Sequence, residues 1–378
     1  MTSLKELALL FLKLGTIGFG GPAAHIALMR DEVVQKRKWL TEDEFLDYLG
    51  AANLIPGPNS TELAIHIGHK QRGIPGLLVA GSCFILPAML IVWIIAWGYQ
   101  KYGSLPEVAG ILAGIKPVII AIVLQAIWGL TKTSVKNIPL GVIGAIALLL
   151  SALGVDEILV LGIAGVLGIL SVQIRGRSAL VLIPTLILSY ALRAAAATGA
   201  ESDSAASPHR VFWSFVKIGS VLYGSGYVLL AFIRAEFVEK LHWLTEAQLL
   251  DAISVGQFTP GPVFTTATFI GYIMAGSAGA ILATIGIFLP AFIFVALSAP
   301  LIPRLRKSKS AGGFLDGVNV ASLALMVLVT WQLGRATLID WKSFLISAVA
   351  CVLLIRYKLN SVWLILAGGA LGALALGI

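Results

Sequence analysis

Apolar runs separated by short polar stretches cover almost the whole chain. Several of these runs reach the ~20 residues that an α-helix needs to cross the hydrocarbon core of a bilayer. The pattern therefore predicts an all-α polytopic membrane protein with about 13 hydrophobic segments. The segments lie at 7–29, 49–69, 76–99, 107–131, 138–153, 157–173, 178–197, 211–233, 249–274, 277–302, 314–333, 342–356 and 361–378.

The chain resembles itself at an offset of 204 positions, where residues 11–61 align with residues 215–265 without a gap. The shared positions are mainly charged, Gly and Pro residues, which apolar segments do not share by chance. Trp-Leu-Thr-Glu recurs at 39–42 and 243–246, and Pro-Gly-Pro recurs at 56–58 and 260–262. The repeat predicts a first half at 1–175, a connecting transmembrane segment and linker at 176–209, and a second half at 210–378.

The number of predicted crossings sets the relative orientation of the halves. Seven segments, including 178–197, separate equivalent points of the two halves. An odd number gives inverted repeats, the arrangement common in secondary transporters. Lys and Arg are more frequent in the loops that are cytoplasmic when the N-terminus is inside. We therefore expect a multi-pass protein of the plasma membrane (the inner membrane of a cell with two) with the N-terminus cytoplasmic and the C-terminus outside.

Composition excludes a soluble protein, because 58% of residues are hydrophobic and only 12% are charged, against about 25% charged in soluble domains. The net charge of +8 is explained by basic cytoplasmic loops, with an anionic substrate as the second reading, and nucleic acid is not an expected partner. Cys83 and Cys351 lie in separate apolar runs, which predicts no metal site and no cofactor. The sequence leaves a homodimer open.

Two kinds of helix break recur in both halves. Pro-Gly-Pro cannot continue a helix, because proline lacks an amide donor and clashes with the preceding turn. The other break is glycine-rich, "GTIGFGGPAAH" at 15–25 and "GSVLYGSGYVL" at 219–229. A helix that restarts after a break directs unpaired amides and a positive dipole end toward it, which favours an anion. Kinking and close glycine packing are the alternative explanation.

Candidate substrate-binding residues lie in and beside these breaks. An intramembrane Lys is costly and often functional, although Lys13 and Lys217 could equally snorkel to the interface. Side-chain amides can donate to an oxyanion, and hydroxyls can do so unless they bond their own helix. The candidates are Lys13, Gly20, Gly21, Pro22, His25, Asn53, Pro56, Gly57, Pro58, Asn59, Ser60, Thr61, Lys217, Gly224, Gln257, Thr259, Pro260, Gly261, Pro262, Thr265 and Thr266.

Five charged residues are candidates for coupling or gating: Glu62, Arg30, Glu32, Arg234 and Glu236. The Arg and Glu residues are spaced i, i+2 and do not face each other on a helix, so interfacial anchoring is the favoured alternative. Glu62 has no equivalent in the second half, and it could carry a coupling proton or pair with a Lys. His66 and His69 have an H-x-x-H spacing but no repeated carboxylate or Cys ligands, so a metal is not expected.

The motif blocks closely resemble those of the chromate ion transporter family, long-chain two-domain type. They are "FGGPAAHIALMRDEVV", "WLTEDEFLDYLGAANLIPGPNSTELAIHIGHKQRG" and "ISVGQFTPGPVFTTATFIGYIMAG". The resemblance implies a secondary transporter that exports chromate from the cytoplasm and confers chromate resistance, with sulfate exchange as a proposed coupling.

Two alternatives to chromate export stay open. One is a transporter of sulfate or another oxyanion or organic anion, because family membership does not fix the substrate. The remote one is a membrane-embedded enzyme on lipid-linked phosphates. An enzyme is not expected, because H-E-x-x-H, G-x-S-x-G and a repeated carboxylate pair are all missing from the sequence.

Overall fold

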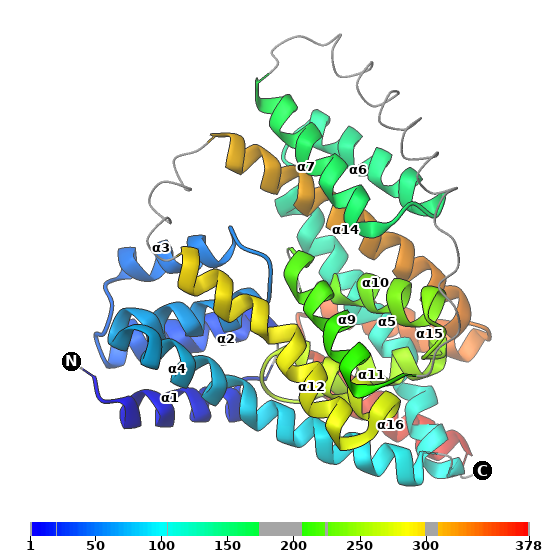
Figure 1. Ribbon diagram of the computed structural model, residues 1–378. Helices are drawn as coiled ribbons and strands as arrows, with labels where there is room; N and C mark the ends of the chain where they lie inside the picture. The colour runs from blue at the N-terminus through cyan, green and yellow to red at the C-terminus, as the bar shows by residue number, and fades with distance from the viewer. Residues whose placement is uncertain are drawn as a thin grey trace.

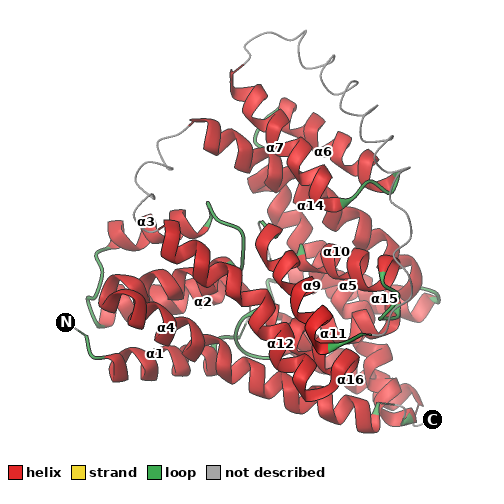
Figure 2. Cartoon of the chain, viewed as in Figure 1, coloured by secondary structure: helices red, strands yellow, loops and turns green. Residues whose placement is uncertain are grey.

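The computed structural model describes residues 2–19, 21–103, 105–173, 206–223, 226–298 and 309–376. This described part is helical and contains no strand (Figures 1 and 2). The predicted segment 178–197 and the candidates Gly20 and Gly224 lie outside the described residues. The helices of the first half are α1 (Leu4–Ile17), α2 (Gly21–Arg30), η1 (Asp31–Lys36), α3 (Glu42–Ala52), α4 (Asn59–Tyr102), α5 (Pro106–Ser134), α6 (Ile138–Ala152) and α7 (Glu157–Gln173).

The second half follows the same order of elements. Its helices are α9 (Pro208–Val221), α10 (Leu229–Ile233), η2 (Arg234–Lys240), α11 (Glu246–Phe258), η3 (Val263–Thr265), α12 (Thr266–Ser298), α14 (Lys309–Thr337), α15 (Trp341–Arg356) and α16 (Ser361–Leu376). The short elements η1 and η2 are π-helical, and η3 is a 3₁₀ turn.

Four helical stretches in the described part are long and apolar enough to cross a membrane: α4, α5, η3 with α12, and α14. Large apolar side chains on them face outward, among them Ile94, Leu297 and Trp331, each at least 65% exposed. Three shorter apolar helices, α6, α7 and α16, accompany them. An outer surface of this kind requires lipid, so the prediction of a polytopic helical membrane protein is confirmed.

The predicted segment 7–29 is a pair of antiparallel helices. Lys13 Nζ lies 2.9 Å from Glu32 Oε1, and Arg37 Nη1 lies 3.0 Å from Glu6 Oε1. Early residues thus pair with late ones around a turn near Gly18, and we call α1, α2 and η1 the first hairpin. Its helix α1 has 14 residues and is about 21 Å long, so it is too short to cross a bilayer alone.

The predicted segment 49–69 belongs to a second hairpin, formed by α3 and the first part of α4. Lys70 Nζ lies 3.1 Å from Glu44 Oε1 at its open end, and the rings of Tyr48 and His66 stack with centroids 5.7 Å apart. The Pro-Gly-Pro turn forms the tip. A non-helical bend at 72–73 separates this arm from the remainder of α4.

The second half repeats the ion pair of the first hairpin and the helix start and bend of the second hairpin. Lys217 lies 2.8 Å from Glu236 in its first hairpin, as Lys13 does from Glu32. Helix α12 bends at 275–276 as α4 does at 72–73. Thr41 and Thr245 each close a capping box at the start of α3 and α11. The sequence repeat is therefore also a repeat of local structure.

The predicted count of about 13 crossings is not confirmed. Two predicted segments of the first half, 7–29 and 49–69, are hairpins whose arms are shorter than a bilayer, and the second half has the same hairpins. The apolar pattern did not separate a hairpin from a crossing, because both give an apolar run of similar length.

Glycine allows the first hairpin to pack closely on α4. A methyl group on Gly15 would clash with the backbone carbonyl of Phe84, and one on Gly219 would clash in the same way with Ile287. Backbone cannot move aside as a flexible side chain can. The equivalent glycines thus set the distance between the first hairpin and the following long helix in each half.

We expect Gly15→Ala to lower the free energy of unfolding by about 1–3 kcal/mol, because the added methyl overpacks this contact. Gly98→Ala on α4 is the matched control, since no atom lies within 4 Å of a Cβ placed there. Thermal unfolding of the purified protein in detergent measures the difference. Equal stability of the two variants would contradict the close contact.

Candidate functional site

The tips of the hairpins are joined across the two halves by a pair of backbone hydrogen bonds. The amide of Gly57 donates to the carbonyl of Leu222, at 2.8 Å, and the amide of Gly261 donates to the carbonyl of Gly18, also at 2.8 Å. These four positions are equivalent at the offset of 204 residues. Each Pro-Gly-Pro tip is therefore held by the glycine-rich break of the other half.

The conformation of both tips requires glycine. Gly57 has φ +138° and Gly261 has φ +86°, a region that residues with a Cβ avoid. A Cβ on Gly57 would clash with the carboxylate of Glu62, and one on Gly261 would lie 2.6 Å from the Cβ of Ala88. The sequence places Gly between two prolines because backbone and neighbours leave no room for a side chain.

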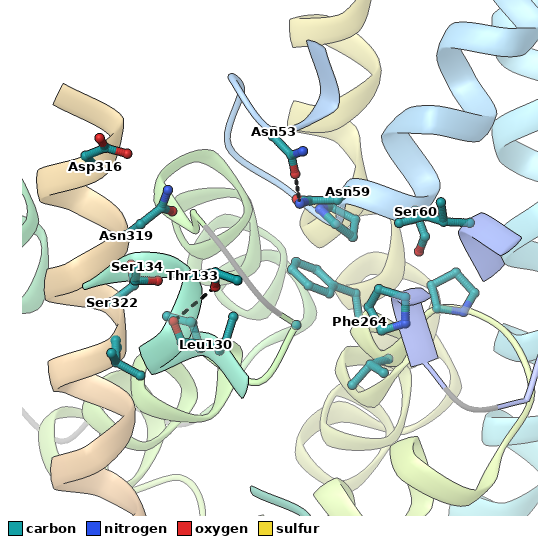
Figure 3. A pocket seen from close by; sticks show the side chains of 18 of the residues that line it. Asn53, Asn59, Ser60, Leu130, Thr133, Ser134, Phe264, Asp316, Asn319 and Ser322 are labelled. Carbon is teal, nitrogen blue, oxygen red and sulfur yellow. Dashed lines mark hydrogen bonds between the residues drawn. The ribbon is translucent and has the colours of Figure 1, made fainter. Parts of the chain in front are cut away.

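A cavity of about 340 Å³ lies where the breaks meet. One wall is made by the breaks of both halves, and the other by α5, α14 and the residues that follow α5. Figure 3 shows Asn53, Asn59 and Ser60 on the first wall, opposite Asn319 and Ser322 of α14. The lining residues are Pro22, Ile26, Asn53, Pro58, Asn59, Ser60, Leu130, Thr133, Ser134, Lys136, Gly226, Val228, Pro262, Val263, Phe264, Asp316, Asn319, Ser322 and Leu323.

Two helical segments begin at this cavity. Helix α4 starts at Asn59, and the first bonds to Pro58 O come from the amides of Thr61 and Glu62. In the second half the amide of Thr265 bonds Pro262 O. The amides of the residues before these donors have no intrahelical acceptor. Both segments therefore present the positive end of the helix dipole at one cavity, which favours an anion.

Lys136 supplies a cationic side chain to the lining. Its ammonium lies 2.7 Å from Asp316 Oδ1, and the two side chains are 56% and 30% exposed. The pair thus connects the end of α5 to α14 beside the cavity. The sequence candidates do not include Lys136, Asp316, Asn319 or Ser322, because none of these residues lies in a repeated motif. The polar residues inside the apolar run of α14 were the available signal.

Six of the sequence candidates line the cavity: Pro22, Asn53, Pro58, Asn59, Ser60 and Pro262. Others hold its wall in place. His25 bonds the carbonyl of Gly18 at 2.9 Å and Ser60 Oγ at 3.3 Å. Gly21 begins α2 with φ +76°, and Pro56 and Pro260 flank the two tip glycines.

Several polar candidates of the second half bond within the protein instead of lining the cavity. The hydroxyls of Thr259, Thr265 and Thr266 donate to the backbone carbonyls of Val255, Pro262 and Val263. The amide oxygen of Gln257 accepts from the hydroxyl of Tyr227 at 3.3 Å. For these hydroxyls the structure matches the alternative of helix back-bonding.

The repeated charged candidates form ion pairs away from the cavity lining. The hydrogen bond from the Lys13 ammonium holds the pKa of Glu32 below its usual value. Lys217 pairs with Glu236 in the same way. Arg30 pairs with Glu42, and Arg234 pairs with Glu246, both at 2.6 Å. The Lys–Glu pairs join the two arms of the first hairpin in each half. The Arg–Glu pairs join that hairpin to the start of the second, so all four pairs position the hairpins.

Three polar side chains at the start of α4 are buried without a hydrogen-bond partner among the described residues: Thr61, Glu62 and His66. Glu62 is fully buried, and its carboxylate lies beside Gly57 at the hairpin tip. It does not line the cavity, although Asn59 and Ser60 of the same helical turn do.

These features together define a helical membrane protein of two like halves whose broken helices meet at one cavity, the architecture typical of secondary transporters. The model of the chromate transporter family matches residues 5–169 and again residues 209–373. The chain therefore belongs to the chromate transporter family, in its two-domain form. Family membership also favours a transporter over an enzyme.

Several relatives match over nearly their full length. A chromate transport protein of Cupriavidus metallidurans is 33% identical, with 98% of this chain and 92% of the relative covered. A chromate transport protein of Pseudomonas aeruginosa is 31% identical, with 96% and 90% covered. An uncharacterized transporter of Methanocaldococcus jannaschii is 30% identical, with 97% and 93% covered. No solved structure matches the chain.

We expect water to reach the cavity wall at Asn319. In a Cys83→Ala and Cys351→Ala background, Asn319→Cys should react with a water-soluble thiol reagent roughly tenfold faster than a shielded thiol, since only an accessible thiolate reacts. Ser347→Cys is the control, because Ser347 is 4% exposed and does not line the cavity. Equal, slow labelling of both would mean that the cavity is closed to water.

Proposed function

We propose that this protein transports chromate, or a chemically similar tetrahedral oxyanion, through the cavity between its hairpin tips. The observation that carries the proposal is that both Pro-Gly-Pro helix starts line one cavity. Each start offers unpaired amides and a positive dipole end. Together they stabilise a dianion without a dedicated pair of arginines.

The size of the cavity suits a small anion that keeps part of its water. At about 30 Å³ per water molecule, 340 Å³ holds an oxyanion with several waters. Asn53, Asn59, Ser60 and Asn319 provide neutral donors, which accept any tetrahedral oxyanion of this size. A transporter of sulfate or another oxyanion is therefore the second candidate function, and competition between the anions separates the two.

Lys136 is the proposed cationic contact for the anion. The carboxylate of Asp316 competes with the anion for the Lys136 ammonium. An anion in the cavity interacts favourably with the ammonium and is repelled by the carboxylate. Because the Lys136–Asp316 pair is partly exposed, water screens it and the ammonium can exchange one partner for the other.

We propose that the hairpins enter the membrane tip first and return to the side from which they came. The charged pair Glu44–Lys70 at the open end and the packing of Ile55, beside the tip, among apolar residues of α4 and α12 support this placement. The crossings between equivalent points are then the second part of α4, α5 and the predicted segment 178–197, while the shorter apolar helices α6 and α7 add either two crossings or none. The number is odd in both cases, so the proposed halves stay inverted. Export from the cytoplasm, exchange for sulfate and chromate resistance are proposed from the family resemblance.

Chromate transport by the purified protein tests the proposed function. Vesicles containing the protein should take up radiolabelled chromate in a saturable manner, and excess sulfate should compete. Cells expressing the protein should accumulate less chromate if the direction is export. Pro58→Ala combined with Pro262→Ala should abolish both effects while the protein remains in the membrane. A folded wild-type protein that moves no chromate would refute chromate as the substrate.

The Lys136–Asp316 pair predicts opposite effects of two charge-removing variants. Lys136→Gln should raise the chromate concentration at half-maximal transport roughly two- to fivefold, the range for a partly exposed charge contact. Asp316→Asn should lower it, because the ammonium then has no competing carboxylate. Lys132→Gln is the control, since Lys132 stacks on Trp128 and does not line the cavity. A shift in the same direction for both variants would contradict the assigned roles.

A further inference from the structure

Glu62 is a buried carboxylate without an ion-pair or hydrogen-bond partner among the described residues. Both its oxygens are unpartnered, and the residue is 0% exposed. An unpaired charge in such surroundings is very unfavourable. A proton is the smallest ligand that removes the charge, and no neighbouring side chain has to move to admit it.

Glu62 lies within one helical turn of the cavity. It follows Asn59 and Ser60, which line the cavity, and its carboxylate contacts the tip at Gly57. At this distance inside the protein an ionised carboxylate and a bound dianion repel each other appreciably. Protonation of Glu62 removes that repulsion.

The segments around Glu62 carry few side chains that could neutralise its carboxylate in place of a proton. The titratable side chains there are Tyr223 on the α9–α10 connection, His25 of α2, already bonded to Gly18 and Ser60, and Tyr48 of α3, stacked on His66. Helix α1 also packs on α4, and the ammonium of its Lys13 pairs with Glu32. Helix α12 contains no Asp, Glu, Lys, Arg or His. No cation on these elements is paired with Glu62.

Two histidines on α4 connect this position to the open end of the hairpin. His66 follows Glu62 by four residues, so the two share a face of the helix. Both ring nitrogens of His66 are buried and unpartnered. His69 lies nearly one turn further along, is partly exposed, and is adjacent to the Lys70–Glu44 pair. A neutral imidazole can accept a proton on one nitrogen and release one from the other.

We propose that Glu62 is the binding site of a proton that moves together with the anion, and that His66 and His69 form its route from the surface. The inference rests on the proposed anion transport. On binding, the proton passes from water through the imidazoles to a carboxylate oxygen of Glu62. On release the O–H bond breaks and the carboxylate forms again. Because each ligand lowers the cost of binding the other, their coupling is positive and reciprocal.

Proton uptake on chromate binding is the first test. Detergent-purified wild-type protein is studied in weakly buffered solutions over a series of rising pH, all at values where free chromate carries no proton. Once the pH is high enough to ionise Glu62 in the unliganded protein, addition of chromate should cause proton uptake. Glu62→Gln should bind chromate without proton uptake. Its chromate affinity should also lose the roughly tenfold decrease that deprotonation of Glu62 causes in the wild type as pH rises. Glu107→Gln, which removes an exposed carboxylate on α5, is the matched control.

Proton movement in vesicles is the second test. Chromate entry should acidify the lumen of wild-type vesicles, and Glu62→Gln should abolish acidification while chromate–chromate exchange continues. His66→Phe, which preserves a ring against Tyr48, should slow acidification but not exchange. If Glu62→Gln fails to fold, lumen acidification by the wild type and by His66→Phe still tests proton movement with the anion and its route through His66.

The outcomes separate this inference from the proposed function. Wild-type protein that binds and transports chromate with no proton uptake at any pH of the series would overturn the role of Glu62 and leave chromate transport intact. Unchanged acidification in folded Glu62→Gln would do the same. Folded wild-type protein that neither binds nor moves chromate would refute the proposed function and joint binding together.

Discussion

The crossed backbone hydrogen bonds between the hairpin tips are the constraint on which the remaining structure depends. A broken helix leaves amides and carbonyls without partners, and in hydrocarbon each costs several kcal/mol. Gly57 and Gly261 satisfy carbonyls of the opposite half, so neither set of breaks is complete without the other. The same exchange brings the two Pro-Gly-Pro helix starts to one place, and the cavity forms there as a consequence.

The sequence predicted the breaks because Pro and Gly act locally. Pro58 and Pro262 lack amides, so helices had to end and restart there whatever packs around them. The hairpins were not predicted, since they depend on which residues meet across a turn. Lys13 lies 19 positions from Glu32, its partner, and a polar residue at that spacing carries no signal in an apolar run. Hence the sequence made Lys13 a candidate for the site, whereas its pairing with Glu32 became visible only in the structure.

For a similar reason, only one of the two walls of the cavity could be predicted from the sequence. The wall made by the breaks lies in the repeated motifs and was found, whereas the wall made by α5 and α14 was not. Lys136 and Asp316 come from parts of the chain that share no repeated motif, and only folding places them together. Asn53 and Asn59 could be recognised in the sequence because they lie beside the Pro-Gly-Pro turn, where a repeated motif coincides with a helix start. The lining residues of α14 lie beside no such motif.

The two halves differ in the charged residues that they carry at equivalent positions, and these differences indicate different roles for the two halves. Glu62 and His66 have no equivalents in α12. Conversely, Asp251 is 4% exposed and lies 3.1 Å from Lys116 of α5, whereas the equivalent Asp47 is exposed. The ion pair of Asp251 and Lys116 is stable while both partners are present, because removal of either residue would leave an unpaired buried charge. The pair therefore ties α11 to the first half, whereas Glu62, which has no partner among the described residues, is the group that we propose changes its charge during transport.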